Sequence, residues 1–256
     1  MRNAVLLVAT LALHCTMSAQ TDPFIATISK AKLSVIPVAC SSWPDDKTQV
    51  TTKEIEGTGF FVSYDGHFVT AAHVIKKHFK WNPAGEPDKA CFPIIYIPNP
   101  TWATGRWFRF GSCIADDTID VAVCKTSLNP FGEKGTHIDR LHFVSSVPPD
   151  GSAVAFTGFP QLILVPVTSR ANVAAVATFF DAEQTEILID KTAWHGVSGA
   201  PVYREDGRVV GIVIETGEGI WSGMAFVRHT STILDFLRVN KIPIWQEGEK
   251  EIPRNK

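Results

Sequence analysis

The sequence lacks an excess of either charge, since 24 Lys and Arg stand against 26 Asp and Glu in 256 residues. Nucleic-acid-binding domains usually carry a large basic excess, so this near-balance argues against such a partner. The sequence also lacks repeats of fixed period, low-complexity tracts and any apolar run of the roughly 20 residues that a membrane-spanning helix needs. With 45% hydrophobic residues, the chain is able to bury a core, and we expect a folded protein with no membrane span and no nucleic-acid partner.

Metal-ligand spacings are missing as well. The chain contains no C-x-x-C and no H-x-x-x-H pair, and its eight histidines form no cluster along the sequence. The tryptophans are scattered, as expected for packing residues. We therefore expect no metal ion and no other cofactor.

The first 19 residues predict a signal peptide. One positive charge at Arg2 precedes an apolar run over residues 4–13, and the small residues Thr16, Ser18 and Ala19 follow. Ten apolar residues are too few to span a bilayer as a helix. His14 stands before Cys15 where a lipid-attachment signal requires a small residue, which argues against lipidation. The mature protein is therefore expected to be exported, either to a periplasm or into the medium.

Removal of that segment leaves four cysteines, Cys40, Cys91, Cys113 and Cys124. Export permits disulfides, but four cysteines allow three pairings and the sequence does not choose among them. Cys113 and Cys124 flank a plausible hairpin and are candidates for one bridge. A buried free thiol at Cys124, inside an apolar run, is the equally weighted alternative.

Period-two patterns and frequent turn residues predict an all-β protein with two halves of about six strands each. The candidate strands are 59–63, 67–70, 92–97, 107–114, 120–125, 153–157, 163–168, 172–178, 186–190, 208–215 and 223–227. The turn at 148–151 divides residues 20–147 from 148–240, and residues 241–256 form a polar tail. Only the end looks helical, with Thr230 or Ser231 as the cap and Ile233, Leu234 and Leu237 on one face.

Three short segments carry catalytic chemistry. His73 follows an apolar strand, Asp120 opens another, and Ser198 stands between Val197 and Gly199 in a turn that begins at Gly196. A serine hydroxyl needs a base such as imidazole, and a carboxylate then fixes the imidazole tautomer. The Gly196 and Ser198 N–H groups are candidates for an oxyanion hole. Asp116 and Asp117 compete for the role of the acid, but they lie in the preceding turn and are better interpreted as solvated acids.

These segments resemble the chymotrypsin-type serine peptidases, and among them the bacterial Deg/HtrA branch. The resemblance rests on His73, Asp120 and Ser198 in that order and on four further segments, 57–62, 158–160, 207–212 and 223–226. It covers residues from about 24 to 240. It implies two perpendicular six-stranded β-barrels of the trypsin-like type, with a serine endopeptidase site in the crevice between them and an acyl-enzyme intermediate. Polypeptides, unfolded proteins among them, are the implied substrates.

The resemblance also implies the substrate contacts. Ile214, Glu215 and Thr216 would pair with extended substrate, and Thr192 and Gly223 would border the primary specificity pocket. No acid stands at Thr192, so a preference for Lys or Arg is not supported, and small or medium apolar side chains are favoured. His195 either lines this cleft or is an exposed loop residue.

The chain departs from the family pattern in three places. Ala200 replaces a usual glycine after the nucleophile, at a position that follows both oxyanion donors. Residues for an appended peptide-binding module do not follow Lys256, so recruitment through such a module and the oligomeric state are not carried over. Val197 replaces the aspartate that pairs with a newly cut N-terminus in digestive relatives, so we expect activity without propeptide cleavage. A non-catalytic peptide-binding or holdase relative, and an esterase with the same triad, remain the alternative functions.

Overall fold

The computed structural model describes residues 22–42, 51–78, 92–99, 104–144, 146–161, 163–178, 185–217 and 219–244. Strands are the most common element in these ranges. The elements in chain order are α1 (Pro23–Ala31), β1 (Val35–Ser42), β2 (Thr51–Phe61), β3 (His67–Thr70), α2 (Ala72–His78), β4 (Phe92–Pro98), β5 (Gly105–Asp116), β6 (Val121–Thr126), η1 (Pro130–Gly132), β7 (Ala153–Gly158), β8 (Val167–Ala177), β9 (Glu186–Ile189), β10 (Pro201–Tyr203), β11 (Val209–Thr216), η2 (Gly219–Trp221), β12 (Ala225–His229) and α3 (Thr230–Val239).

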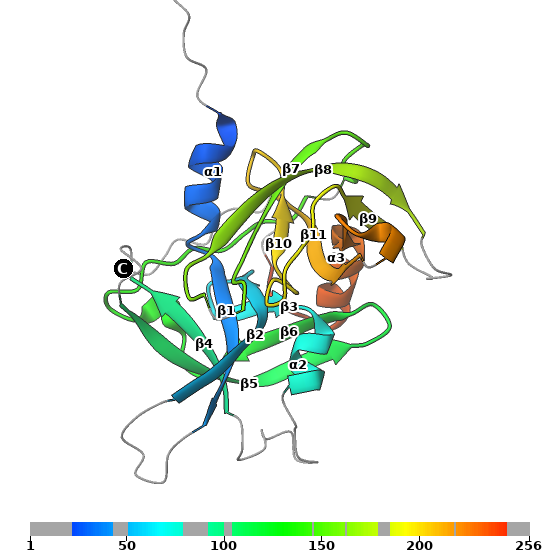
Figure 1. Cartoon of the computed structure of the whole chain (residues 1–256). Coiled ribbons are helices and arrows are strands. Elements are labelled where there is room, and N and C mark those ends of the chain that lie inside the picture. Colours follow the sequence, from blue (N-terminus) through cyan, green and yellow to red (C-terminus); the bar gives the residue numbers. More distant parts are fainter. Residues whose placement is uncertain are drawn as a thin grey trace, which may run out of the picture.

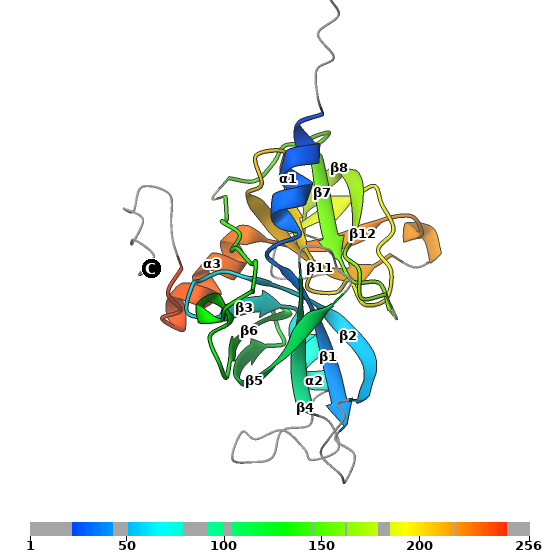
Figure 2. The same ribbon diagram turned by 90° about the vertical axis from the view of Figure 1, so that its left-hand side faces the viewer.

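The strands form two closed antiparallel barrels of six strands each. The first barrel has the order β1-β2-β3-β6-β5-β4, and the second has the order β10-β11-β12-β9-β8-β7. In Figure 1 the first barrel lies below the second, and the same stacking is seen from the side in Figure 2. The predicted all-β, two-barrel fold with a C-terminal helix is therefore confirmed.

Each barrel has its own core, and a third cluster lies between elements of both. In β3, Phe68 packs inside the first barrel while its neighbour Val69 joins the shared cluster. In β6, Ala122 and Cys124 face inward while Val121 and Val123 join the shared cluster. Successive side chains of a strand point to opposite faces, so a continuous apolar run indicates a strand buried on both sides. This burial fixes where β6 begins, and Asp120 stands directly before it.

Helix α1 was not predicted from the sequence. Asp22 caps it by accepting a hydrogen bond from Phe24 N at 3.0 Å, and Pro23 occupies the first turn, where a missing N–H is harmless. Phe24 is buried, Arg170 of β8 stacks 4.5 Å above its ring, and the Arg170 guanidinium pairs with Asp22. The helix thus packs on the second barrel immediately before the chain enters β1 of the first, as both views show (Figures 1 and 2).

The prediction that only the chain's end is helical was wrong for α2 as well, which begins two residues after β3. The C-terminal helix α3 is present, but its cap is His229 rather than Thr230 or Ser231. The His229 Nδ1 accepts from Ser231 N at 3.1 Å, a contact that only the folded backbone reveals. The helix contacts β11 and β12 of the second barrel and β6 of the first.

Three strand assignments need correction. Residues 163–166 are not a strand, because β8 starts only after Pro166, which has no N–H for a ladder hydrogen bond. The segments 163–168 and 172–178 therefore contribute to one strand and not to two. Strands β1 and β10 were not predicted: β1 contains Pro37, which weakens a strand pattern, and β10 has only three residues.

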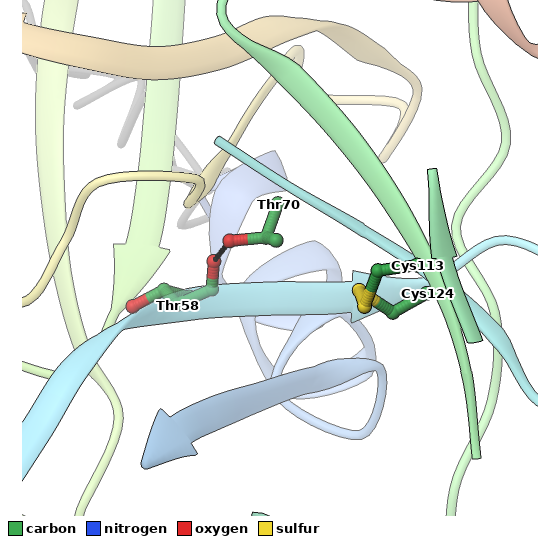
Figure 3. The surroundings of a disulfide bond; sticks show 4 residues. All are labelled: Thr58, Thr70, Cys113 and Cys124. Carbon is green, nitrogen blue, oxygen red and sulfur yellow. Dashed lines mark hydrogen bonds between the residues drawn. A yellow bond between two sulfur atoms is a disulfide. The ribbon is translucent and has the colours of Figure 1, made fainter. Parts of the chain in front are cut away.

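A disulfide joins Cys113 of β5 to Cys124 of β6, where the two residues are direct partners across the hairpin (Figure 3). The sequence left open whether Cys124 forms a disulfide with Cys113 or is a buried free thiol, and the structure contains the disulfide. Cys40 is also disulfide-bonded, and Cys91 lies outside the described residues.

Among the residues described, no helix has the length and apolar character needed to cross a membrane.

Candidate active site

His73 and Asp120 are held together by two hydrogen bonds. Asp120 Oδ2 lies 2.8 Å from His73 Nδ1, and Asp120 Oδ1 accepts from the backbone N–H of His73 at 2.9 Å. That N–H belongs to the first turn of α2, where backbone donors have no partner inside the helix. An ionised carboxylate only accepts hydrogen bonds, so Nδ1 carries the ring proton and Nε2 is left as a base. His73 remains partly exposed, with 39% of its side chain accessible.

The backbone of Asp120 is in the left-handed region, with φ +52°. Aspartate tolerates this region better than most residues, and it lets the chain turn sharply before β6. The two competing acids have other partners. Asp116 accepts from Thr118 N at 2.9 Å, and Asp117 pairs with Lys76 at 2.5 Å on the surface. The turn thus brings only Asp120, of the three acids, to His73.

Ser198 lies in a compact segment, residues 194–200, which we call the nucleophile turn. Val197 N donates to Trp194 O at 3.1 Å, and Gly196 occupies the third position of this tight turn with φ +92°. A positive φ at that position is typical of a type II turn, which glycine adopts without strain. Ala200 N then donates to Val197 O at 2.8 Å and closes the segment.

The nucleophile turn packs against the segment that carries His73. A Cβ on Gly199 would lie 2.2 Å from Thr58 O and 2.8 Å from Ala71 N, so only glycine permits this approach. A Cβ on Gly57 would contact both Val74, the residue after His73, and Ser198 O. The segments that carry Ser198 and His73 therefore contact each other across the two barrels. No hydrogen bond joins Ser198 Oγ to His73 in the described part of the chain, and such contacts often tighten only when substrate binds.

The directions of the two predicted oxyanion donors are set by hydrogen bonds to the carbonyl groups of the same two peptides. His195 O accepts from Gln161 N at 2.8 Å, and Val197 O accepts from Ala200 N. In a trans peptide the C=O and the N–H point in opposite directions, so Gly196 N–H and Ser198 N–H are directed away from these partners. Within the ranges described, neither N–H donates a hydrogen bond. Both N–H groups thus lack an acceptor within the described part of the chain.

The departures at Ala200 and Val197 are accommodated in the core of the second barrel. Both side chains are buried there, at 0% and 1% exposure. Ala200 O also accepts from Val213 N at 2.9 Å, so the residue is tied to β11. The Ala200 methyl therefore contributes to the packing of this core.

The residues predicted to contact substrate lie at the end of β11 and on the segment facing it. Gly199 N donates to Val213 O, which places Ile214 next to the nucleophile turn, and Thr216 Oγ1 donates to Ala193 O at 3.1 Å. Glu215 is exposed and Ile214 is nearly buried. The remaining predicted residues are Thr192, which neighbours Ala193 and is half-buried, His195, whose residue is exposed, and Gly223, which is exposed beside β12.

Sequence reasoning missed Thr58, which is fully buried in β2 and contacts the nucleophile turn through both its backbone and its side chain. Its only sequence signal is a β-branched hydroxyl residue between two glycines, Gly57 and Gly59. A cavity of ≈ 250 Å³ lies elsewhere, near Lys32, Ile97 and His137, and includes none of the predicted site residues. Among the described side chains, no three His, Cys, Asp or Glu residues are grouped to hold a metal ion.

Comparisons with known proteins agree with the two-barrel fold. A family model described as a trypsin-like peptidase domain matches residues 57–212. The fold is similar to the crystal structure of the Rv3671c protease from M. tuberculosis in its active form, with a TM-score of 0.61, 19% identity and 88% of each chain covered. An inactive serine-to-alanine mutant of Rv3671c from M. tuberculosis H37Rv gives a TM-score of 0.61 at 18% identity, covering 88% of this chain and 97% of that one. No match is found among curated proteins.

Proposed function

The chain belongs to the family of trypsin-like peptidases and is a serine endopeptidase, and we propose that it cuts peptide bonds with a triad of Ser198, His73 and Asp120. The observation that carries this assignment is a pair of hydrogen bonds. Asp120 accepts from both the backbone N–H and the Nδ1 of His73, directly beside the turn of Ser198. In the neutral ring this arrangement puts the proton on Nδ1, so Nε2 is the nitrogen that can accept a proton, as a general base requires.

In the proposed reaction, Ser198 Oγ attacks the carbonyl carbon of the scissile bond while its proton passes to His73 Nε2. The carbonyl oxygen becomes an oxyanion and accepts hydrogen bonds from Gly196 N–H and Ser198 N–H. His73 then gives its proton to the leaving amine, the C–N bond breaks, and an acyl-enzyme remains. Water repeats the attack with His73 as the base, and the acid product leaves with Ser198 restored. Asp120 keeps its charge and stabilises the imidazolium.

The proposed substrates are extended or unfolded polypeptides, which pair with β11 at Ile214–Thr216. The primary pocket, bordered by Thr192 and Gly223, would hold a small or medium apolar side chain. Two features support this preference. Thr192 carries no charge that would attract Lys or Arg, and the hydrogen bond from Thr216 Oγ1 to Ala193 O links the two segments that flank the pocket. Such a link leaves less room for a large side chain.

We also propose that the enzyme is exported after removal of residues 1–19. Those residues lie outside the described ranges, so the support comes from the sequence pattern and from the Cys113–Cys124 disulfide. Disulfides persist in oxidising compartments and are rare in the cytosol.

The test compares the wild type with Ser198→Ala in two assays. A fluorophosphonate probe should label only the wild type, and unfolded casein should be cut only by the wild type, with kcat lowered by about 10⁶-fold in the variant. Labelling without any cleavage of casein or of short peptides would favour an esterase. Absence of labelling in a folded wild type would favour a peptide-binding protein and would contradict the proposed triad.

A further inference from the structure

Thr58 connects the two barrels at the nucleophile turn with its side-chain hydroxyl. Its Oγ1 donates to Gly196 O at 2.7 Å and accepts from Phe159 N at 2.9 Å. Thr58 belongs to β2 of the first barrel, whereas both partners lie in loops of the second. The hydroxyl therefore spans the boundary between the barrels with both of its hydrogen bonds, and it is fully buried.

The backbone of Thr58 contacts both halves of the site. β3 pairs with β2 only as far as Phe60 and Val69, so the Thr58 N–H and C=O face past the end of β3. There Thr58 N donates to Ser198 O at 2.8 Å, and Thr58 O accepts from Thr70 Oγ1 at 2.7 Å (Figure 3). Thr70 is the last residue of β3, three positions before His73.

In the described part of the chain, the hydroxyl donates to the carbonyl of the 196–197 peptide, which lies between the two peptides that carry the predicted oxyanion donors. The 195–196 peptide is held through His195 O by Gln161 N, and the 197–198 peptide through Val197 O by Ala200 N. Between them, the 196–197 peptide is held through Gly196 O by Thr58 Oγ1. Rotation of this middle peptide changes the torsion angles on both sides of it, and those angles aim the Gly196 and Ser198 N–H groups.

The same hydroxyl also supports the anchor on His195 O. By accepting from Phe159 N, Thr58 Oγ1 positions the loop that carries Gln161 two residues later. A Cβ on Gly196 would lie 2.4 Å from Phe159 O and 2.8 Å from Gln161 N, so this loop and the nucleophile turn are in direct contact. Both oxyanion donors thus depend on one threonine.

We propose that Thr58 Oγ1 is a positioning group for the oxyanion hole, acting from the first barrel on the nucleophile turn of the second. This inference rests on the proposed function, because the turn needs precise N–H directions only if an oxyanion forms there. Thr58 contacts no substrate atom, and its role is exerted through Gly196 and Phe159.

The test replaces the hydroxyl without changing the shape of the side chain. Thr58→Val should lower kcat by about 10- to 100-fold and leave KM within about threefold, since loss of an oxyanion donor outright costs about 10²- to 10³-fold. Thr58→Ser keeps the hydroxyl and should restore kcat to within about threefold of the wild type. The matched control is Thr126→Val, which removes another buried threonine hydroxyl of the first barrel, bonded to Gly66 O, and should keep the wild-type kcat.

Affinity for a peptide aldehyde, whose adduct with the serine carries an oxyanion, gives a second readout. It should fall in Thr58→Val by about the same factor as kcat, and remain unchanged in Thr126→Val. If Thr58→Val does not fold, Thr58→Ala takes its place. Its kcat is then compared with that of Thr58→Ser at a temperature well below the Tm of both variants. Wild-type kcat in a folded Thr58→Val or Thr58→Ala, or an equal loss in Thr126→Val, would overturn the inference. An inactive wild type would instead overturn the proposed function.

Discussion

At the scale of single residues, the site depends on groups that serve two partners at once. Asp120 uses both carboxylate oxygens on His73, and Thr58 uses its hydroxyl as donor and acceptor together. Removal of such a group leaves more than one polar atom without a partner, and each buried unsatisfied atom costs about 1–3 kcal/mol. Substitutions here should affect activity far more than their small change in volume suggests.

Asp120→Asn tests this at the catalytic pair. An amide replaces one of the two carboxylate oxygens with a donor, so the positions that accept from His73 N–H and from Nδ1–H are no longer both acceptors. With the NH₂ towards the ring, the tautomer with the proton on Nε2 is favoured. We expect kcat to fall by about 10³- to 10⁴-fold with KM changed by less than about threefold. Steady-state kinetics on a peptide substrate measure both. Asp117→Asn, which affects only the surface pair with Lys76, is the control and should behave as wild type. A kcat within tenfold of wild type in Asp120→Asn would exclude this role.

At the scale of elements, helices α1 and α3 both contribute residues to the apolar cluster that the two barrels share. Helix α1 packs on the second barrel just before the chain enters the first, and α3 contacts strands of both. The cap of α3 is unusual, because the His229 Nδ1 accepts from Ser231 N while the side chain is buried at 2% exposure. Its Nε2 has no hydrogen-bond partner in the described part of the chain.

This cap makes stability depend on pH. Burial lowers the pKa of His229 below its ordinary value of 6.5, so the unfolded chain binds a proton more readily than the folded one. The contribution of neutral His229 to the free energy of unfolding is therefore fully present above pH 6.5. It is lost as the pH falls below 6.5 towards the lowered pKa of His229 in the folded state. Tm should fall between pH 7.5 and 5, by about 2–4 °C for each kcal/mol lost.

His229→Asn keeps a capping acceptor and removes the titrating ring, so its Tm should vary less over that pH range than the Tm of the wild type. Differential scanning calorimetry of both proteins measures the two slopes. His142, whose pKa burial also lowers, acts in the same direction and is present in both proteins, so the difference isolates His229. Parallel Tm curves would show that His229 does not contribute.

At the scale of the whole molecule, the barrels meet through a shared apolar cluster and the site forms where they join. The cluster includes Phe60 and Val123 from the first barrel and Phe159 and Ile212 from the second, with Leu237 of α3. His73 and Asp120 come from the first barrel and Ser198 from the second, so their relative position depends on this packing. Val197, in the turn of Ser198, is buried among apolar residues. At this position the turn therefore has no carboxylate to pair with the ammonium group of an N-terminus.

We therefore expect activity without proteolytic activation. An inserted ammonium group would be buried beside Val197 with no counterion, which is strongly unfavourable. A chain starting at Gln20 and carrying a tag-extended N-terminus should cleave casein at the same rate as the chain with a free N-terminus. If activity appeared only after a defined cut between Gln20 and β1, this expectation would be wrong.

The sequence was sufficient for the strand-rich fold and for the local settings of the three candidate residues, because both depend on short-range patterns. Alternation of apolar residues marks strands such as β5 and β6, and glycines next to Ser198 mark a tight turn. It failed where local signals conflict with tertiary contacts. Pro37 obscured β1, the apolar run at 163–165 was taken for a strand, and α1 and α2 were too short to show a clear period.

What the sequence determined by itself is thus the set of candidate residues for the proposed triad. The sequence already favoured Asp120 over Asp116 and Asp117, and the structure shows that Asp120 reaches His73. Tertiary structure alone decided that Cys113 pairs with Cys124 and that Thr58 touches the turn of Ser198. Each of these depends on contacts between residues distant in the chain, and some link the two barrels. Such contacts are fixed by how whole strands pack and pair, a property that no short window of sequence contains.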